Sequence, residues 1–244
     1  WSGALLGLWL TRGALRKFPG TLVLAALGVW HNWKPLLGVN RDIFIRSLML
    51  QLVFFSITLQ GARLGDATVA ANALLLNGLL LAAHALDGLA HAVEALCGHA
   101  IGARDRNALR RSMVVACGWS LLASVVFALL FLFGGHLFIE MQTDIPSVRE
   151  TAFQYLPYLA LLPLIAVWSY LLDGLFIGAT RAREMRDAML ISVVIAFPAA
   201  WALHGSGNHG LWVSFLLFMV LRSLTLGMYA WRMQRKDQWF TARA

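Results

Sequence analysis

Charged residues are scarce in this sequence. Lys, Arg, Asp and Glu together make up 13% of the 244 residues, whereas hydrophobic residues make up 59%. A water-soluble domain usually carries about 25% charged residues, so this composition excludes an ordinary soluble globular protein. The formal net charge is +8, but the basic residues lie in short clusters between long apolar runs. That arrangement is typical of membrane topology and argues against a nucleic-acid partner.

The sequence has only two cysteines and no nucleotide-binding motif of the GxxxxGK[ST] type. The two cysteines, Cys97 and Cys117, form no CxxC motif, and we interpret both as small apolar residues rather than as a disulfide or a metal site. The sequence contains no GxxxxGK[ST] motif, so an intrinsic ATP-driven pump is not supported. No charged segment and cleavage site precede the apolar start at Trp1, so no signal peptide is visible.

Long apolar runs are abundant. A helix needs roughly 20 apolar residues to cross a hydrocarbon core about 30 Å thick. Runs of this length without two-residue alternation exclude a membrane barrel. The fold class is therefore all-α, a polytopic transmembrane helical bundle with six complete spans, at about 43–64, 69–97, 112–134, 152–179, 188–204 and 211–231.

Four regions follow from these spans. Residues 1–11 are expected to be the end of a truncated transmembrane helix, and 12–42 a cytoplasmic or interfacial linker. Within the linker, the apolar stretch 21–33 is too short to span, and Trp30, Trp33 and Lys34 suit a helix at the membrane surface. Residues 43–231 form the six-helix lobe, and 232–244 a cytoplasmic tail.

The basic residues predict the orientation of the spans. Seventeen of the twenty Lys and Arg residues lie in the linker or at the very start of the first span, in the second and fourth loops, or in the tail. The positive-inside rule makes that side cytoplasmic. The opposite loops, at 65–66, 143–150 and 205–210, are expected to be periplasmic.

The second span carries a stripe of polar residues. Asn77, His84, Asp87, His91 and Glu94 fall within an arc of about 100° at helical spacing. Polar side chains are costly against lipid, so we expect this stripe to face the interior of the lobe. The opposite face carries apolar residues, namely Leu79, Leu86, Ala90 and Val93.

Three interpretations of the stripe remain open. It can pack against a neighbouring helix, with local neutralisation such as Asp87 by His91. It can line a water-filled cavity in which an acid exchanges a proton with solvent. It can also form a metal site from His84, Asp87, His91 and Glu94, although no second cluster of ligands supports a metal.

Arg222 lies near the centre of the last span, too deep to reach the membrane surface easily. It requires an acidic partner, for which Asp173 on the fourth span and Asp87 are the candidates. A structural or coupling charge pair is favoured over direct contact with substrate.

Four segments resemble a known family. They are LDGLAHAVEALCG at 86–98, AIGARD at 100–105, LDGLFIGATR at 172–181 and FMVLR at 218–222. They are similar to the multidrug and toxic compound extrusion (MATE) family, in its DNA-damage-inducible F branch. The resemblance covers essentially the whole chain, in the order of helices seven to twelve.

This resemblance implies a multi-pass antiporter of the bacterial inner membrane, built from two six-helix lobes, of which this chain is the C-terminal one. Its partners would be small organic substrates, membrane lipid and the N-terminal lobe. A proton or sodium gradient would drive it, without a cofactor and without enzymatic activity. Asp87, Glu94, Asp173 and Arg222 match positions that recur in the branch, whereas the usual proton-coupling acid would lie on the N-terminal lobe.

Two alternatives belong to other classes of protein. One is an integral-membrane metalloenzyme that uses His84, Asp87, His91 and Glu94. The other is a flippase for lipid-linked precursors, since related folds move such substrates.

Overall fold

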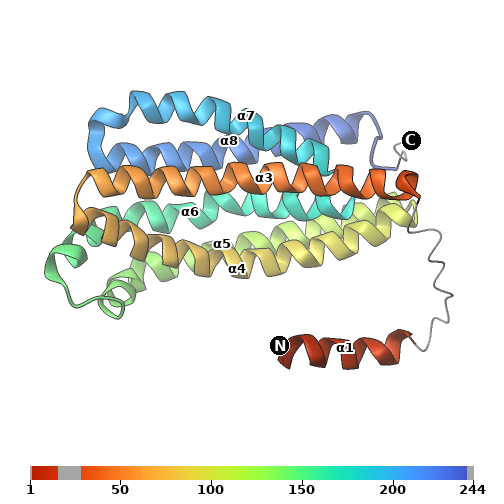
Figure 1. Cartoon of the computed structure of the whole chain (residues 1–244), viewed down its shortest axis with the longest axis horizontal. Helices are drawn as coiled ribbons and strands as arrows, with labels where there is room; N and C mark the ends of the chain where they lie inside the picture. The colour runs from red at the N-terminus through yellow and green to blue at the C-terminus, as the bar shows by residue number, and fades with distance from the viewer. Residues whose placement is uncertain (1, 16–28, 241–244) are drawn as a thin grey trace. The chain divides into compact units, whose positions relative to one another are not determined.

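The computed structural model describes residues 2–15 and 29–240, and the chain divides into two compact units, Trp1–Gly38 and Val39–Ala244. In the first unit, α1 (Ser2–Leu15) is a regular helix (Figure 1). Most of the surface helix expected at 21–33 falls at 21–28, outside the described residues. Its last residues belong to α3, which begins at Trp30 and continues without interruption into the first complete span.

The prediction of an all-α membrane protein with six complete spans is confirmed. Six described helices are long and apolar enough to cross a membrane, and no strand occurs within the ranges just given. They are α3 (Trp30–Arg63), α4 (Asp66–Gly102), α5 (Arg106–Glu140), α6 (Pro146–Gly178), α7 (Ala182–Ala202) and α8 (Gly207–Arg235), with a short 3₁₀ turn η1 (His204–Ser206) between the last two (Figure 1).

The helices extend beyond the apolar runs that predicted them. The third span was expected at 112–134, but α5 begins at Arg106, where the Asp105 carboxylate accepts the backbone N–H groups of Asn107 and Ala108 at 2.9 Å. This cap satisfies amides that have no partner inside the helix. Apolar length therefore locates a span, and the capping residues set where its helix ends.

α6 is the central helix of the second unit. Its apolar residues lie on all faces of the helix, and it packs against α4, α5 and α8. In its most apolar stretch 61% of the residues are buried, against 17% for α3. An all-round apolar helix suits a central position, and Pro157 and Pro163 lie within it without ending it.

A buried amide pair joins α4 to α8. Asn72 and Asn208 donate to each other's side-chain oxygens at 2.7 and 3.0 Å, and the Trp212 indole donates to Asn72 at 2.9 Å. All three residues are buried. Because each buried amide here finds a partner, the contact stabilises the bundle and fixes the register of the two helices.

α3 contacts the rest of its unit in a different way. Its backbone makes few close approaches to the other helices, and it reaches them instead through long side chains. Phe54, for example, packs its ring 5.7 Å from that of Phe215 on α8. This separation leaves room for cavities along α3.

Candidate functional site

A cavity of about 590 Å³ lies between α3, α4, α6 and α8. Most of its wall is apolar, but ionisable side chains from all four helices reach it. They are Arg46 on α3, Asp87, His91 and Glu94 on α4, Asp173 on α6 and Arg222 on α8. Concave sites with a few convergent polar groups are the usual location of ligand binding.

Asp173 joins three helices at this cavity. Arg46 of α3 and Arg222 of α8 both donate to the same carboxylate oxygen, Oδ2. Asp173 is 5% exposed and Arg222 is 2% exposed. One carboxylate therefore neutralises two guanidinium groups only in part, and the pair that the sequence suggested is in fact a triad.

The triad is not fully hydrogen-bonded. Asp173 Oδ1 and Arg222 Nε are both buried without a partner among the described residues. The Arg222 guanidinium also lies 5.7 Å from the centre of the Tyr170 ring, a cation–π distance. Buried polar atoms without partners are uncommon, and these two lie where α3, α6 and α8 meet.

The sequence positions Asp173 through two glycines that follow it. A Cβ atom on Gly174 would overlap the carbonyl group of Ala90 on α4, and one on Gly178 would overlap that of Glu94. The G-x-x-x-G spacing thus lets α6 and α4 approach backbone to backbone. This close approach brings Asp173 to the same cavity wall as Asp87.

The polar stripe of α4 is oriented differently from the prediction. The face that carries Leu86 and Val93 is buried in the bundle, with exposed fractions of 2% and 1%. The polar face turns outward, where Asn77, Asp87, His91 and Glu94 line the open cavity. The stripe therefore does not pack inside the bundle, and four of its five members instead line the cavity, as in the second interpretation of the stripe.

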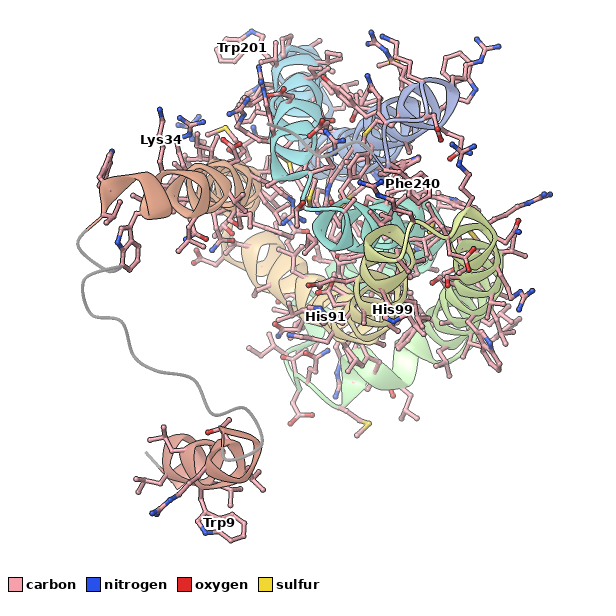
Figure 2. The ribbon with its side chains drawn as sticks, turned by 90° about the vertical axis from the view of Figure 1, so that its right-hand side faces the viewer. Trp9, Lys34, His91, His99, Trp201 and Phe240 are labelled. Carbon is pink, nitrogen blue, oxygen red and sulfur yellow. The ribbon has the colours of Figure 1, made fainter. Side chains whose placement is uncertain are left out.

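The members of the stripe do not pair as anticipated. His91 contacts Glu94 at 3.2 Å rather than Asp87, and its side chain is 76% exposed; Figure 2 shows His91 on α4. Asn77 is within 3.5 Å of Gln142. His84 is exposed and does not line the cavity. Asp87 forms no hydrogen bond or ion pair with any residue in the described part of the chain.

The histidines and acids of α4 do not assemble a metal site. Across residues 2–15 and 29–240, no group of three or more His, Cys, Asp or Glu side chains is arranged to hold a metal ion. His84 lies outside the cavity that the other three members of the proposed metal site share. The metal-site interpretation therefore has no support in the geometry.

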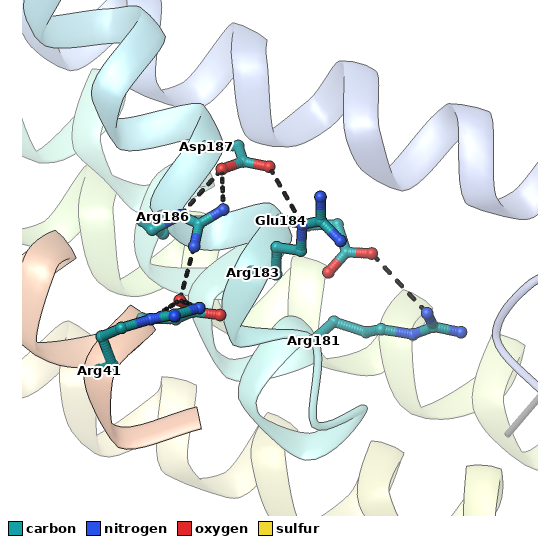
Figure 3. A network of polar contacts seen from close by, with 7 residues as sticks. Arg41, Arg181, Arg183, Glu184, Arg186 and Asp187 are labelled. Atoms are coloured by element: carbon teal, nitrogen blue, oxygen red, sulfur yellow. Dashed lines mark hydrogen bonds and ion pairs between the residues drawn. The ribbon is translucent and has the colours of Figure 1, made fainter. Parts of the chain in front are cut away.

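A second ionic contact ties α3 to α7. Asp42, four residues before Arg46, accepts from Arg186 at 2.6 Å, and Arg186 also bonds to Asp187 at 2.6 Å (Figure 3). Together with the Asp173 triad, this contact fixes α3 at two positions one helical turn apart. Both contacts lie toward the N-terminal half of α3.

Sequence reasoning missed Arg46. It was counted among the basic residues that define the cytoplasmic side, although it falls three residues inside the first predicted span. Its side chain is 17% exposed and bonds to Asp173. The position of Arg46 inside a span could have revealed its role, because an arginine within a span requires a partner, as Arg222 does.

Comparison with known proteins identifies the family. The sequence model of the MatE family matches residues 43–202. The chain is 41% identical over 241 residues to DNA damage-inducible protein F of Escherichia coli K12, covering 98% of this chain and 52% of that protein. It is 30% identical to the probable multidrug resistance protein NorM of Rhodopseudomonas palustris, over 73% of this chain and 36% of that protein.

A solved structure agrees with the fold. The crystal structure of a MATE protein in the bent conformation superposes with a TM-score of 0.71 at 22% identity, over 86% of this chain and 48% of that one. The chain spans about half the length of the curated relatives that it matches most extensively. On the family match and the 41% identity, this chain belongs to the MatE family of membrane transporters.

Proposed function

We propose that this chain is the C-terminal lobe of a secondary antiporter that exports organic compounds across the bacterial inner membrane. The observation that carries this proposal is the cavity in which, among the described residues, Asp87 forms no ion pair and Asp173 Oδ1 has no hydrogen-bond partner. Ionisable groups at membrane depth are costly, and their position at an open cavity favours an ion pathway. Proteins of this family are transporters and not enzymes, so we do not retain the metalloenzyme alternative.

The triad provides a way to couple ion binding to helix position. A proton or a sodium ion that binds Asp173 competes with Arg46 and Arg222 for the carboxylate. An ion can shift a conformational equilibrium only if it binds the two states with different affinity. Weakening the Arg46 contact would release α3 at this point, and ion occupancy would then favour one arrangement of the cavity over another.

The outward-facing stripe of α4 is an argument that a second lobe lies beside it. His84 and His91 are exposed, and such side chains are unfavourable against hydrocarbon. A polar face of this kind requires water or protein beside it. We assign it to the N-terminal six-helix lobe, which would close the cavity from the other side and bind the organic substrate with it.

Transport by the full-length protein in proteoliposomes tests this proposal. With an imposed proton or sodium gradient, we expect a fluorescent organic cation such as ethidium to move against its own gradient. A protonophore should abolish the movement if protons drive it, and a sodium ionophore if sodium does. Movement that survives the collapse of both gradients would contradict the proposal, as would movement of a labelled lipid in place of the cation.

Cysteine labelling in intact cells tests the orientation. In a background without Cys97 and Cys117, a cysteine at Ser206 is expected to react with an impermeant thiol reagent, because the loop at 205–210 carries no Lys or Arg. A cysteine at Asn107, within a basic cluster, is expected to remain unlabelled until the cells are opened. The reverse pattern would invert the topology.

A further inference from the structure

A second cavity, of about 550 Å³, lies along the other half of α3, where α3 faces α7 and α8. It is distinct from the Asp87 cavity and contains none of its ionisable residues. Its walls are mainly apolar, with Val53 and Ile57 on α3, Phe197 on α7, and Phe215 and Phe218 on α8. A groove of this composition between membrane spans suits a hydrocarbon chain.

The groove has the length of one leaflet of the membrane. Ten residues separate Val53 from Arg63, the last residue of α3, and they correspond to about 15 Å of helix. This is half of a hydrocarbon core of about 30 Å. His204 lies just past the end of α7 at the same mouth of the groove. The groove therefore runs from the level where the spans end toward the middle of the membrane.

An aromatic residue marks the mouth as interfacial. Trp201, in the last turn of α7, is 84% exposed and points away from the bundle (Figure 2). Tryptophan is enriched where the membrane meets water. This position agrees with a head group at the Arg63 end of the groove and an acyl chain in its apolar part.

The mouth also carries a cation, Arg63, that has no counter-charge within residues 2–15 and 29–240. Three basic residues lie outside the cytoplasmic clusters. Arg149 bonds to Asp144 and to backbone carbonyls, and Arg222 bonds to Asp173. Arg63 forms no ion pair or hydrogen bond with a described residue, and Asp66, three positions further on, does not pair with it. A guanidinium group favours phosphate because it can donate two parallel hydrogen bonds.

We propose that this groove binds one membrane phospholipid with an anionic head group. The lipid phosphate accepts from Arg63, and one acyl chain lies along α3 between Phe197 and Phe215. Gln60, one turn before Arg63, also reaches the groove and offers a further polar contact to the head group. The proposal requires that α3, α7 and α8 span the membrane, but it does not depend on the transport function.

Lipid titration of the full-length protein tests the proposal. In detergent, phosphatidylglycerol is expected to raise the melting temperature more than phosphatidylcholine does, and native mass spectrometry should retain one phosphatidylglycerol per chain. Arg63→Gln should weaken phosphatidylglycerol binding about tenfold, the loss of one charge-assisted contact, whereas Arg63→Lys should restore part of it. Ala200→Trp, which obstructs the groove close to its mouth, should abolish the retained lipid.

Two controls make the result decisive. Arg111→Gln removes an exposed charge on α5, outside the groove, and should leave lipid binding unchanged. Inorganic phosphate alone should not stabilise the protein, because it lacks an acyl chain. Equal phosphatidylglycerol binding by the wild type and Arg63→Gln would overturn the proposal, as would an equal loss in Arg111→Gln or equal stabilisation by free phosphate.

Discussion

Replacing Asp173 by asparagine is expected to lower the free energy of unfolding of the full-length protein by about 3–5 kcal/mol, the range for removing one partner of a buried ion pair. Asparagine keeps the shape of the side chain but removes its charge. Arg46 and Arg222 would then lie beside each other with no counter-charge on Asp173. Thermal or denaturant unfolding in detergent measures the change.

Variants of Arg222 provide the comparison for the stability of Asp173→Asn. Arg222→Met leaves Asp173 paired with Arg46, so its expected loss of stability is smaller than that of Asp173→Asn. Combining Arg222→Met with Asp173→Asn removes one of the two stranded cations and should recover part of the loss. If Asp173→Asn unfolds like the wild type, or if the double variant is the least stable of the three, the triad does not hold these helices as described.

Asp87→Asn is expected to reduce gradient-driven efflux to background while the protein remains folded. Asp87 lines the cavity but has no ion-pair partner in the described residues, so its neutralisation strands no buried cation. The change in stability should stay within about 0.5 kcal/mol, as for substitutions away from packed or paired groups. Efflux from cells and the melting temperature, measured on the same variant, separate the two effects.

Glu150→Gln is the matched control for this variant. It neutralises an exposed carboxylate in the first turns of α6, away from the cavity, and is expected to leave both efflux and stability unchanged. If Asp87→Asn exports substrate as fast as the wild type does, Asp87 has no role in the ion pathway. A large loss of stability would instead reveal a partner for Asp87 in the full-length protein.

Hydrophobic length was sufficient to predict the fold. Each of the six apolar runs lies largely within one long helix, because a membrane leaves the backbone few ways to satisfy its hydrogen bonds. The depth of a charged residue within its span also predicted that it needs a partner. Arg222 near the middle of a span demanded an acidic neighbour, and Asp173 was one of two candidates.

The orientation of α4 could not be predicted from its sequence. Periodicity separated a polar face from an apolar one, but lipid and the interior of a membrane bundle are both apolar. The apolar face with Leu86 and Val93 is compatible with either environment, and in the structure it packs into the bundle. In a soluble protein the same pattern would have decided which face is buried, because water is the only alternative.

Contacts between distant segments were also beyond the sequence. Asp42 and Arg186 are 144 residues apart, and neither position is unusual by itself near the end of a span. The spacing of Gly174 and Gly178 was visible, but it does not say which helix approaches them. Such pairings depend on the order in which the helices pack, which composition and periodicity do not encode.

The loose packing of α3 has a mechanical consequence. Asp42 and Arg46 anchor one half of the helix, whereas the half that ends at Arg63 is held mainly by side chains such as Phe54 against Phe215. α4 and α6, in contrast, meet backbone to backbone at Gly174 and Gly178. We therefore expect the half of α3 that ends at Arg63 to bend more easily than the half held by the two ionic contacts. We expect α4 and α6 to move together, because their backbones are in direct contact.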